Sequence, residues 1–203
     1  MKMSMTPFAL YRLICSWLSA SYLREEALRY DEHIYRKALT EFWYDYIRWY
    51  PLDNDIERSK LNLTIQLHPV LTYRLARLYF LEGDERSASI YSLLGRIQGL
   101  VEIYYSAQIG RGWKINHGIG SVIGARCVIG DNCLLHQGVT LGDKDGGRPI
   151  IGNNVIIYAG AVVLGNITIG DDSIIGANAV CLQSVPSHAI CVGVPAKNIN
   201  KNE

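Results

Sequence analysis

A six-residue repeat between residues 103 and 182 places the strongest constraint on how this 203-residue chain can fold. An amphipathic helix would space its aliphatic residues by three and four, and a simple strand would alternate without a fixed glycine. Neither describes this stretch, in which a glycine often follows the aliphatic residue and a small side chain often precedes it by two positions. The positions in register are Ile103, Ile109, Ile115, Ile123, Ile129, Leu135, Leu141, Ile151, Ile157, Val163, Ile169, Ile175 and Cys181.

Hexapeptide periodicity of this kind predicts a parallel β-helix, in which each unit is a short strand plus a turn and three units form one triangular coil. The aliphatic side chain points into the prism, and glycine or asparagine takes the tight corner. The repeat gives about four coils, which exceeds the roughly three that a solenoid needs for a continuous core. We therefore expect a mainly β domain over residues 101–197, followed by a short tail, 198–203.

The register breaks twice. Two extra residues fall within 116–120, and four extra residues fall within 143–149. A solenoid accommodates insertions only where they bulge outward, and such bulges commonly carry the binding face. These two segments are therefore the places where function is expected.

Residues 1–100 follow a different pattern, with Leu, Arg, Tyr and Trp at helical spacing and few glycines. Helices are predicted over 7–26, 31–49, 68–81 and 86–99. The ends of a solenoid are exposed strand edges that proteins usually cover. We interpret this half as an α-helical domain that caps the solenoid and could build an oligomer.

Composition excludes several classes of function. A net charge of +1 with 19% charged residues gives no basic surface for nucleic acid. No segment approaches the ~20 apolar residues of a membrane span, although the first helix could touch a membrane surface if it does not simply pack in the core. Five cysteines without a CxxC pair indicate reduced thiols in the cytoplasm, with no disulfide and no metal site.

Several motifs in a fixed order carry a family resemblance over roughly residues 73–197. They are AQIGRG at 107–112, INHG at 115–118, GVTLG at 138–142, LGNI at 164–167 and GVPAK at 193–197. Together they resemble the hexapeptide-repeat acyltransferases, and within them the serine O-acetyltransferase family. The resemblance implies a left-handed coil and transfer of an acetyl group from acetyl-CoA to a hydroxyl.

The resemblance also implies that His117 is the general base and that Glu102, where the family has Asp, orients the imidazole. An alcohol is a poor nucleophile until a base with a pKa near 7 removes its proton. Counting hexads predicts that Glu102 and His117 lie on one face of the prism in successive coils. The simpler interpretations are a histidine closing a corner and an ordinary surface glutamate.

Three further residues are candidates for binding the acceptor. Asn116 stands where the family has an Asp before the catalytic His, and Arg148 matches an arginine that meets the carboxylate of serine, although the neighbouring His of that pair is missing. His136 occupies a position that is usually apolar. It is predicted to lie one coil above His117, where it could bind a polar acceptor or the thioester oxygen, or simply be exposed.

By resemblance, CoA would be held at Gly142, Ala159, Ala177 and Lys197, the last contacting a phosphate. The two alanines could equally be small residues at coil corners. The family associates as trimers with the active site between neighbouring prisms, and its serine branch pairs trimers into hexamers. A homotrimer is therefore expected, with a dimer of trimers as the alternative.

The acceptor is the open question. Glu102 in place of Asp, the polar residue before His117 and the position of His136 resemble the branch that acetylates exopolysaccharide sugars, such as the colanic-acid acetyltransferases. Tyr104 and Tyr105 would suit hydrogen bonds and stacking with a sugar, so a sugar hydroxyl is the favoured hypothesis. Serine is the alternative acceptor. A non-catalytic solenoid scaffold is the second alternative.

Overall fold

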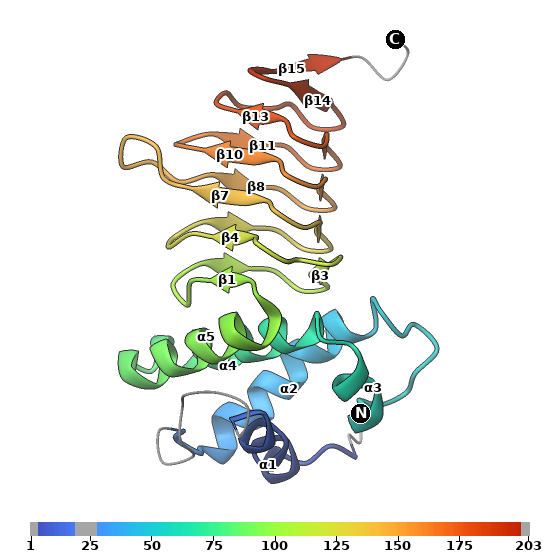
Figure 1. The fold of residues 1–203 in the computed structure, drawn as a ribbon, viewed down its shortest axis with the longest axis vertical. Coiled ribbons are helices and arrows are strands. Elements are labelled where there is room, and N and C mark those ends of the chain that lie inside the picture. Colours follow the sequence, from blue (N-terminus) through green and yellow to red (C-terminus); the bar gives the residue numbers. More distant parts are fainter. Residues whose placement is uncertain (1–3, 19–27, 200–203) are drawn as a thin grey trace.

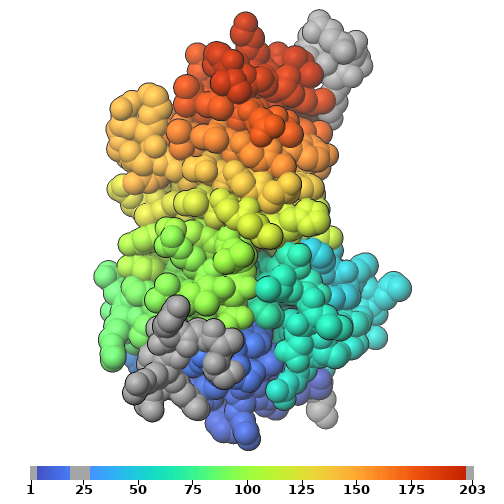
Figure 2. Space-filling view, in the orientation of Figure 1, coloured from blue at the N-terminus to red at the C-terminus, as the bar shows by residue number. Residues whose placement is uncertain are grey.

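The computed structural model describes residues 4–18 and 28–199 and has two stacked parts (Figure 1). Helices form the base, and a column of coils rises from it to the C-terminal hairpin. The predicted architecture, a β-solenoid preceded by a helical region, is confirmed. The space-filling view shows the loop that contains residues 143–149 standing out from one side of the column (Figure 2).

The base consists of α1 (Pro7–Leu18), α2 (Glu32–Tyr46), α3 (Arg58–Leu63), α4 (Leu67–Leu81) and α5 (Glu85–Gly99). Asp31 and Asp84 accept hydrogen bonds from the backbone amides of Ile34 and Ser87, which caps α2 and α5 at their N-termini. The six-residue helix α3 was not predicted from the sequence. The part of the predicted first helix beyond residue 18 lies outside the described residues.

In the described part of the chain, fifteen short strands form the three faces of the prism. Strands β1 to β14 pair in parallel with the strand one coil above or below, and β15 pairs antiparallel with β14 in the C-terminal hairpin. Face A contains β1 (Glu102–Ile103), β4 (Val122–Ile123), β7 (Thr140–Gly142), β10 (Val162–Leu164) and β13 (Val180–Cys181). Face B contains β2 (Gln108–Ile109), β5 (Val128–Ile129), β8 (Ile150–Ile151) and β11 (Thr168–Ile169). Face C contains β3 (Lys114–Ile115), β6 (Leu134–Leu135), β9 (Ile156–Ile157), β12 (Ile174–Ile175), β14 (Ile190–Gly193) and β15 (Ala196–Ile199).

The residues that recur every six positions in the sequence are the residues that pack inside the prism. All thirteen repeat positions predicted to point inward are buried, none more than 8% exposed. The corners use left-handed backbone, with asparagine, aspartate or glycine at most of them, because these residues adopt positive φ at little cost. Four complete coils, from β1 to β12, are followed by a fifth in which face B is reduced to a bridge at Val185.

Helix α4 covers the lower edge of the first coil. The Tyr73 hydroxyl donates to the carbonyl of Ala107 (2.8 Å) and accepts from the amide of Ile109 (3.1 Å). The Arg74 guanidinium donates to the carbonyls of Ile109 (2.7 Å) and Gly110 (2.6 Å). These bonds occupy strand-edge groups that have no lower coil to pair with.

A buried ion pair fixes this junction. Arg74 binds both carboxylate oxygens of Asp45, from Nε at 2.8 Å and from Nη2 at 2.9 Å, and the amide of Trp113 donates to the same carboxylate at 2.8 Å. Asp45 is fully buried and Arg74 is 6% exposed. One residue from α2, one from α4 and the backbone of the first coil therefore meet at a single buried point.

Candidate active site

His117 lies in the first insertion, in the turn that joins face C to face A. Its backbone is left-handed, with φ 63°, and the side chain is exposed. Gly118 and Gly120 follow, also at positive φ. A Cβ on Gly118 would lie 2.6 Å from Cγ2 of Ile115, so this turn depends on glycine for both conformation and space. The bulge therefore presents His117 to the surface on a tightly folded backbone.

Glu102 opens face A, and its carboxylate pairs with Arg96 of α5 at 3.0 Å. The prediction that Glu102 and His117 share one face in successive coils is wrong. A coil takes three units, so Glu102 begins the first coil on face A and His117 follows the last strand of that same coil on face C. Among the described residues the structure records no direct bond between their side chains.

The segment before Glu102 nevertheless lies against the His117 turn. The amide of Gly120 donates to the carbonyl of Leu100 (3.0 Å), and a Cβ on Gly118 would lie 2.9 Å from Cγ2 of Val101. A hollow of about 200 Å³ next to Glu102 is lined by Ser89, Ser92, Leu93, Arg96, Tyr104 and Tyr105. The backbone that precedes Glu102 is therefore in contact with the turn that carries His117.

His136 lies one coil above Asn116, and therefore one position from the predicted place above His117. The amide of Asn116 bonds to the carbonyl of Leu135 (2.7 Å), and the amide of His136 bonds to the carbonyl of Ile157 (3.0 Å). Burial, and to a lesser extent the charge of His117, hold the pKa of His136 below its ordinary value. Its surroundings therefore favour the neutral imidazole of His136 more than water does.

Tyr158 is a site residue that the sequence analysis missed. Its ring stacks on that of His136, with centroids 5.1 Å apart and planes at 24°. It follows the inward residue Ile157 at a position where many repeat units carry glycine, and that departure is the signal that could have revealed it. Asn116, His136 and Tyr158 form a polar column up the corner between faces C and A.

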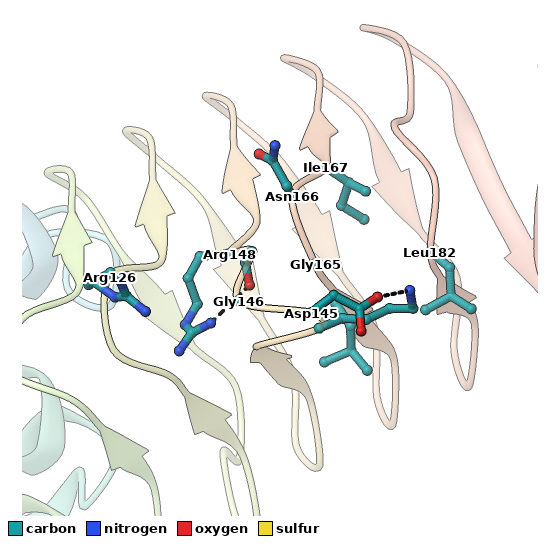
Figure 3. Close-up of a pocket in the computed structure, with 11 residues that line it drawn as sticks. Arg126, Asp145, Gly146, Arg148, Gly165, Asn166, Ile167 and Leu182 are labelled. Atoms are coloured by element: carbon teal, nitrogen blue, oxygen red, sulfur yellow. Dashed lines mark hydrogen bonds and ion pairs between the residues drawn. The ribbon is translucent and has the colours of Figure 1, made fainter.

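Arg148 lies in the second insertion, at the corner between faces A and B. Its Nε donates to the carbonyl of Ala125 (2.9 Å), its Nη1 donates to the carbonyl of Gly147 (3.0 Å), and it pairs with Asp143. A groove of about 720 Å³ runs beside this loop (Figure 3). Within one chain, Arg148 and His117 therefore occupy different corners of the prism.

The positions predicted to hold CoA are only partly brought together. Ala159 and Ala177 lie on the same corner as His136, in the coils above it, and the amide of Asn178 bonds to the carbonyl of Ala159 (2.8 Å). Gly142 is the last residue of β7, at the corner where face A turns into face B, and so lies away from Ala159 and Ala177. Lys197 lies in β15, opposite Val192 in the C-terminal hairpin.

Among the described residues, 4–18 and 28–199, no group of three or more His, Cys, Asp or Glu side chains could hold a metal ion. None of the helices in that part of the chain is long and apolar enough to cross a membrane. None of the five cysteines, all of which lie among the described residues, is in a disulfide, and four of them are buried.

Comparison with known families gives two matches within the solenoid. Residues 148–183 match the family described as bacterial transferase hexapeptide (six repeats), and residues 121–144 match the hexapeptide repeat of succinyl-transferase. Both matches lie where the six-residue register was recognised from the sequence.

Individual proteins extend the likeness. A serine acetyltransferase of Staphylococcus aureus (strain Mu50) is 44% identical over 140 residues, which span 67% of this chain and 66% of the relative, just under two thirds. The crystal structure of serine acetyltransferase from Neisseria gonorrhoeae in complex with serine superposes with a TM-score of 0.80 at 31% identity, covering 97% of this chain and 84% of that one. A serine acetyltransferase in complex with CoA superposes with a TM-score of 0.75 at 29% identity, covering 95% of this chain and 84% of that one.

These relatives correct one prediction from the sequence. They are serine acetyltransferases, and they do not support the exopolysaccharide branch as the nearest group. The features that suggested a sugar acceptor, Asn116 and His136, are local departures on a chain that resembles serine acetyltransferases along nearly its whole length.

Proposed function

The chain belongs to the serine acetyltransferase family of hexapeptide-repeat proteins, and from this we propose that it transfers the acetyl group of acetyl-CoA to the hydroxyl of serine. The observation that carries the proposal is the likeness to a serine acetyltransferase solved with serine, which extends over 84% of that enzyme and includes the helical base. Direct transfer needs no covalent enzyme intermediate.

His117 is the proposed general base. It takes the proton of the serine hydroxyl as that oxygen attacks the thioester carbonyl, and the resulting tetrahedral intermediate collapses with loss of the CoA thiolate, which takes up the proton from the imidazolium. The exposed position of His117 on a glycine-flanked turn leaves room for both substrates. Glu102 stabilises the imidazolium, and Arg96 holds Glu102 in place from α5.

Neighbouring groups position the reactants. The Asn116 amide oxygen accepts from the ammonium group of serine, and His136 donates to or accepts from the acceptor or the thioester oxygen. Ala159 and Ala177 allow CoA to approach the backbone on the coils above, and Lys197 adds to that site. Gly142, at the corner between faces A and B, would contribute to it from a neighbouring subunit. The cofactor is acetyl-CoA, used as a substrate.

A homotrimer is part of the proposal. Arg148 lies at a different corner from His117, so it can meet the acceptor carboxylate only at the His117 of a neighbouring subunit. Residues 1–100 cap the solenoid and provide the surface through which two trimers could pair. Residues 101–197 form the acyltransferase domain, and the chain acts in the cytoplasm.

The test is release of free CoA from acetyl-CoA with L-serine as acceptor. Wild-type protein should turn over, His117→Ala should lose about 10²- to 10⁴-fold in kcat, and the control His33→Ala, an exposed histidine on α2, should retain full activity. Absent turnover with L-serine, together with turnover on nucleotide sugars, would replace serine with a sugar hydroxyl. Activity independent of His117 would contradict the mechanism, and a biological effect preserved in His117→Ala would indicate a scaffold.

A further inference from the structure

The groove beside the second insertion is lined by both basic and apolar side chains. Arg126, Lys144 and Arg148 supply the basic groups. Leu164, Ile167 and Leu182 supply apolar surface from the coils above. At about 720 Å³ the groove is large enough for a substrate-sized ligand.

Two of the three cations already have partners on the same loop. Lys144 pairs with Asp145 at 2.6 Å, and Arg148 pairs with Asp143 while its Nε and Nη1 donate to backbone carbonyls. Asp143 and Asp145 are the acidic groups of this loop, and both are neutralised by these pairs. Within the described part of the chain, no hydrogen bond or ion pair is recorded for Arg126 or for Nη2 of Arg148.

Arg126 also occupies a backbone position that does not suit arginine. Its φ is 65°, in the left-handed region. At equivalent turns of the solenoid this conformation belongs to Asn132, Asn154 and Asp172, whose short polar side chains tolerate it. An arginine gains nothing locally from this conformation, so its presence indicates a role for the side chain. His117, the proposed base, is another side chain held at positive φ in this way.

Figure 3 shows Arg126 and Arg148 as neighbours at one end of the groove, which both of them line. Two guanidinium groups with free donors in one groove, with no further carboxylate recorded as a partner among the described residues, form a site for an oxyanion. A guanidinium matches the paired oxygens of a carboxylate or a phosphate through parallel N–H bonds.

We propose that Arg126, together with the free edge of Arg148, binds an oxyanion of a substrate in this groove, with the apolar wall covering the adjoining part of the ligand. The inference rests on the proposed function, which supplies two such oxyanions: the carboxylate of the amino-acid acceptor and the phosphates of CoA. Arg126 is thus a specificity-determining residue in addition to those suggested by the family resemblance.

Arg126→Asn is the informative variant, because asparagine suits the left-handed turn and should leave the fold at least as stable. Arg126→Lys keeps the charge but loses the planar fork. Arg86→Gln, which removes an exposed arginine on α5, is the control for net charge. Titration calorimetry on the full-length protein would measure the Kd for CoA, 3′-dephospho-CoA and L-serine, and thermal unfolding would check the fold.

We expect Arg126→Asn to weaken the binding of one of these ligands by about tenfold to a hundredfold, Arg126→Lys to weaken it less, and Arg86→Gln to leave it unchanged. Weaker binding of L-serine by the variant identifies the carboxylate as the oxyanion, and weaker binding of CoA identifies a phosphate. If the binding of 3′-dephospho-CoA is unchanged, the phosphate is the 3′-phosphate. Kd values within twofold of wild type for all three ligands would overturn the inference. Binding is measured without turnover, so the wild-type reaction with L-serine tests the proposed function separately.

Discussion

Replacing Arg74 with methionine should destabilise the junction between the helical base and the solenoid more than any single surface change. The substitution removes a bidentate ion pair with Asp45 and two hydrogen bonds to the carbonyls of Ile109 and Gly110, all at a buried point. Burial already raises the pKa of Asp45, and Arg74 opposes that shift. Without Arg74, Asp45 keeps only the amide of Trp113 as a recorded partner.

Removing one partner of a buried ion pair costs about 3–5 kcal/mol, because the other charge is left uncompensated. For a chain of this length that corresponds to a fall of about 6 to 20 °C in the midpoint of thermal unfolding. The double variant Arg74→Met with Asp45→Leu removes both charges, so it should be less destabilised than the sum of the two single variants by about 2 kcal/mol or more.

Urea denaturation and thermal unfolding of the three variants, at one protein concentration, give the comparison. A loss below about 1 kcal/mol for Arg74→Met, or strict additivity in the double variant, would refute the claim that this ion pair joins the two parts. Arg36→Met, which breaks an exposed pair with Glu32 on α2, is the matched control and should cost less than about 1 kcal/mol.

Three other perturbations have defined outcomes. Gly118→Ala places a Cβ 2.6 Å from Ile115 Cγ2 at a φ of 75°. We expect the free energy of unfolding, measured by urea denaturation, to fall by at least about 1 kcal/mol, and turnover to decrease. Unchanged values for both would contradict the role given to this turn. Burial lowers the pKa of His68, so as pH falls the unfolded chain takes up a proton at this histidine before the folded chain does. The free energy of unfolding should therefore decrease below about pH 6.5, and the decrease should be smaller in His68→Gln. Equal pH profiles for the two proteins would show that His68 does not titrate on unfolding. Burial raises the pKa of Cys127 and Cys133 to about 11, so a thiol reagent should label them only on unfolding, and rapid labelling of the native protein would show that the prism is open.

The fold could be predicted from the sequence because a solenoid repeats one local rule. Each buried aliphatic residue, from Ile103 to Cys181, has the same environment as its neighbour one coil away, so periodicity alone fixes strand positions and register. The helical base has no such repetition. The short helix α3 went unpredicted because, at six residues, it shows too little periodicity to stand out.

The candidate site was predicted less completely, for geometric reasons. His117 and Arg148 fall in insertions that interrupt the repeat, and interruptions are visible in a sequence. The relation of Glu102 to His117 depends on how the chain turns through three corners. Counting hexads put the two residues on one face of successive coils, whereas Glu102 begins face A and His117 follows face C of the same coil. Tyr158 leaves only a weak trace in the sequence, a tyrosine where many repeat units carry glycine, and its stacking on His136 makes its place clear. Arg126 becomes apparent only from its place in the groove beside the second insertion.

The stacking of coils also sets the distance between residues on different coils. Successive strands of face C rise by about 4.8 Å, so β14 stands about 19 Å above β3, and β15, which carries Lys197, pairs with β14. The span between His117 and Lys197 is thus set by the number of coils, and it changes only in whole steps. A ligand that must contact both residues is selected by its length as much as by its chemistry. The gain or loss of one coil would change the distance between the two residues without changing the local structure around either of them.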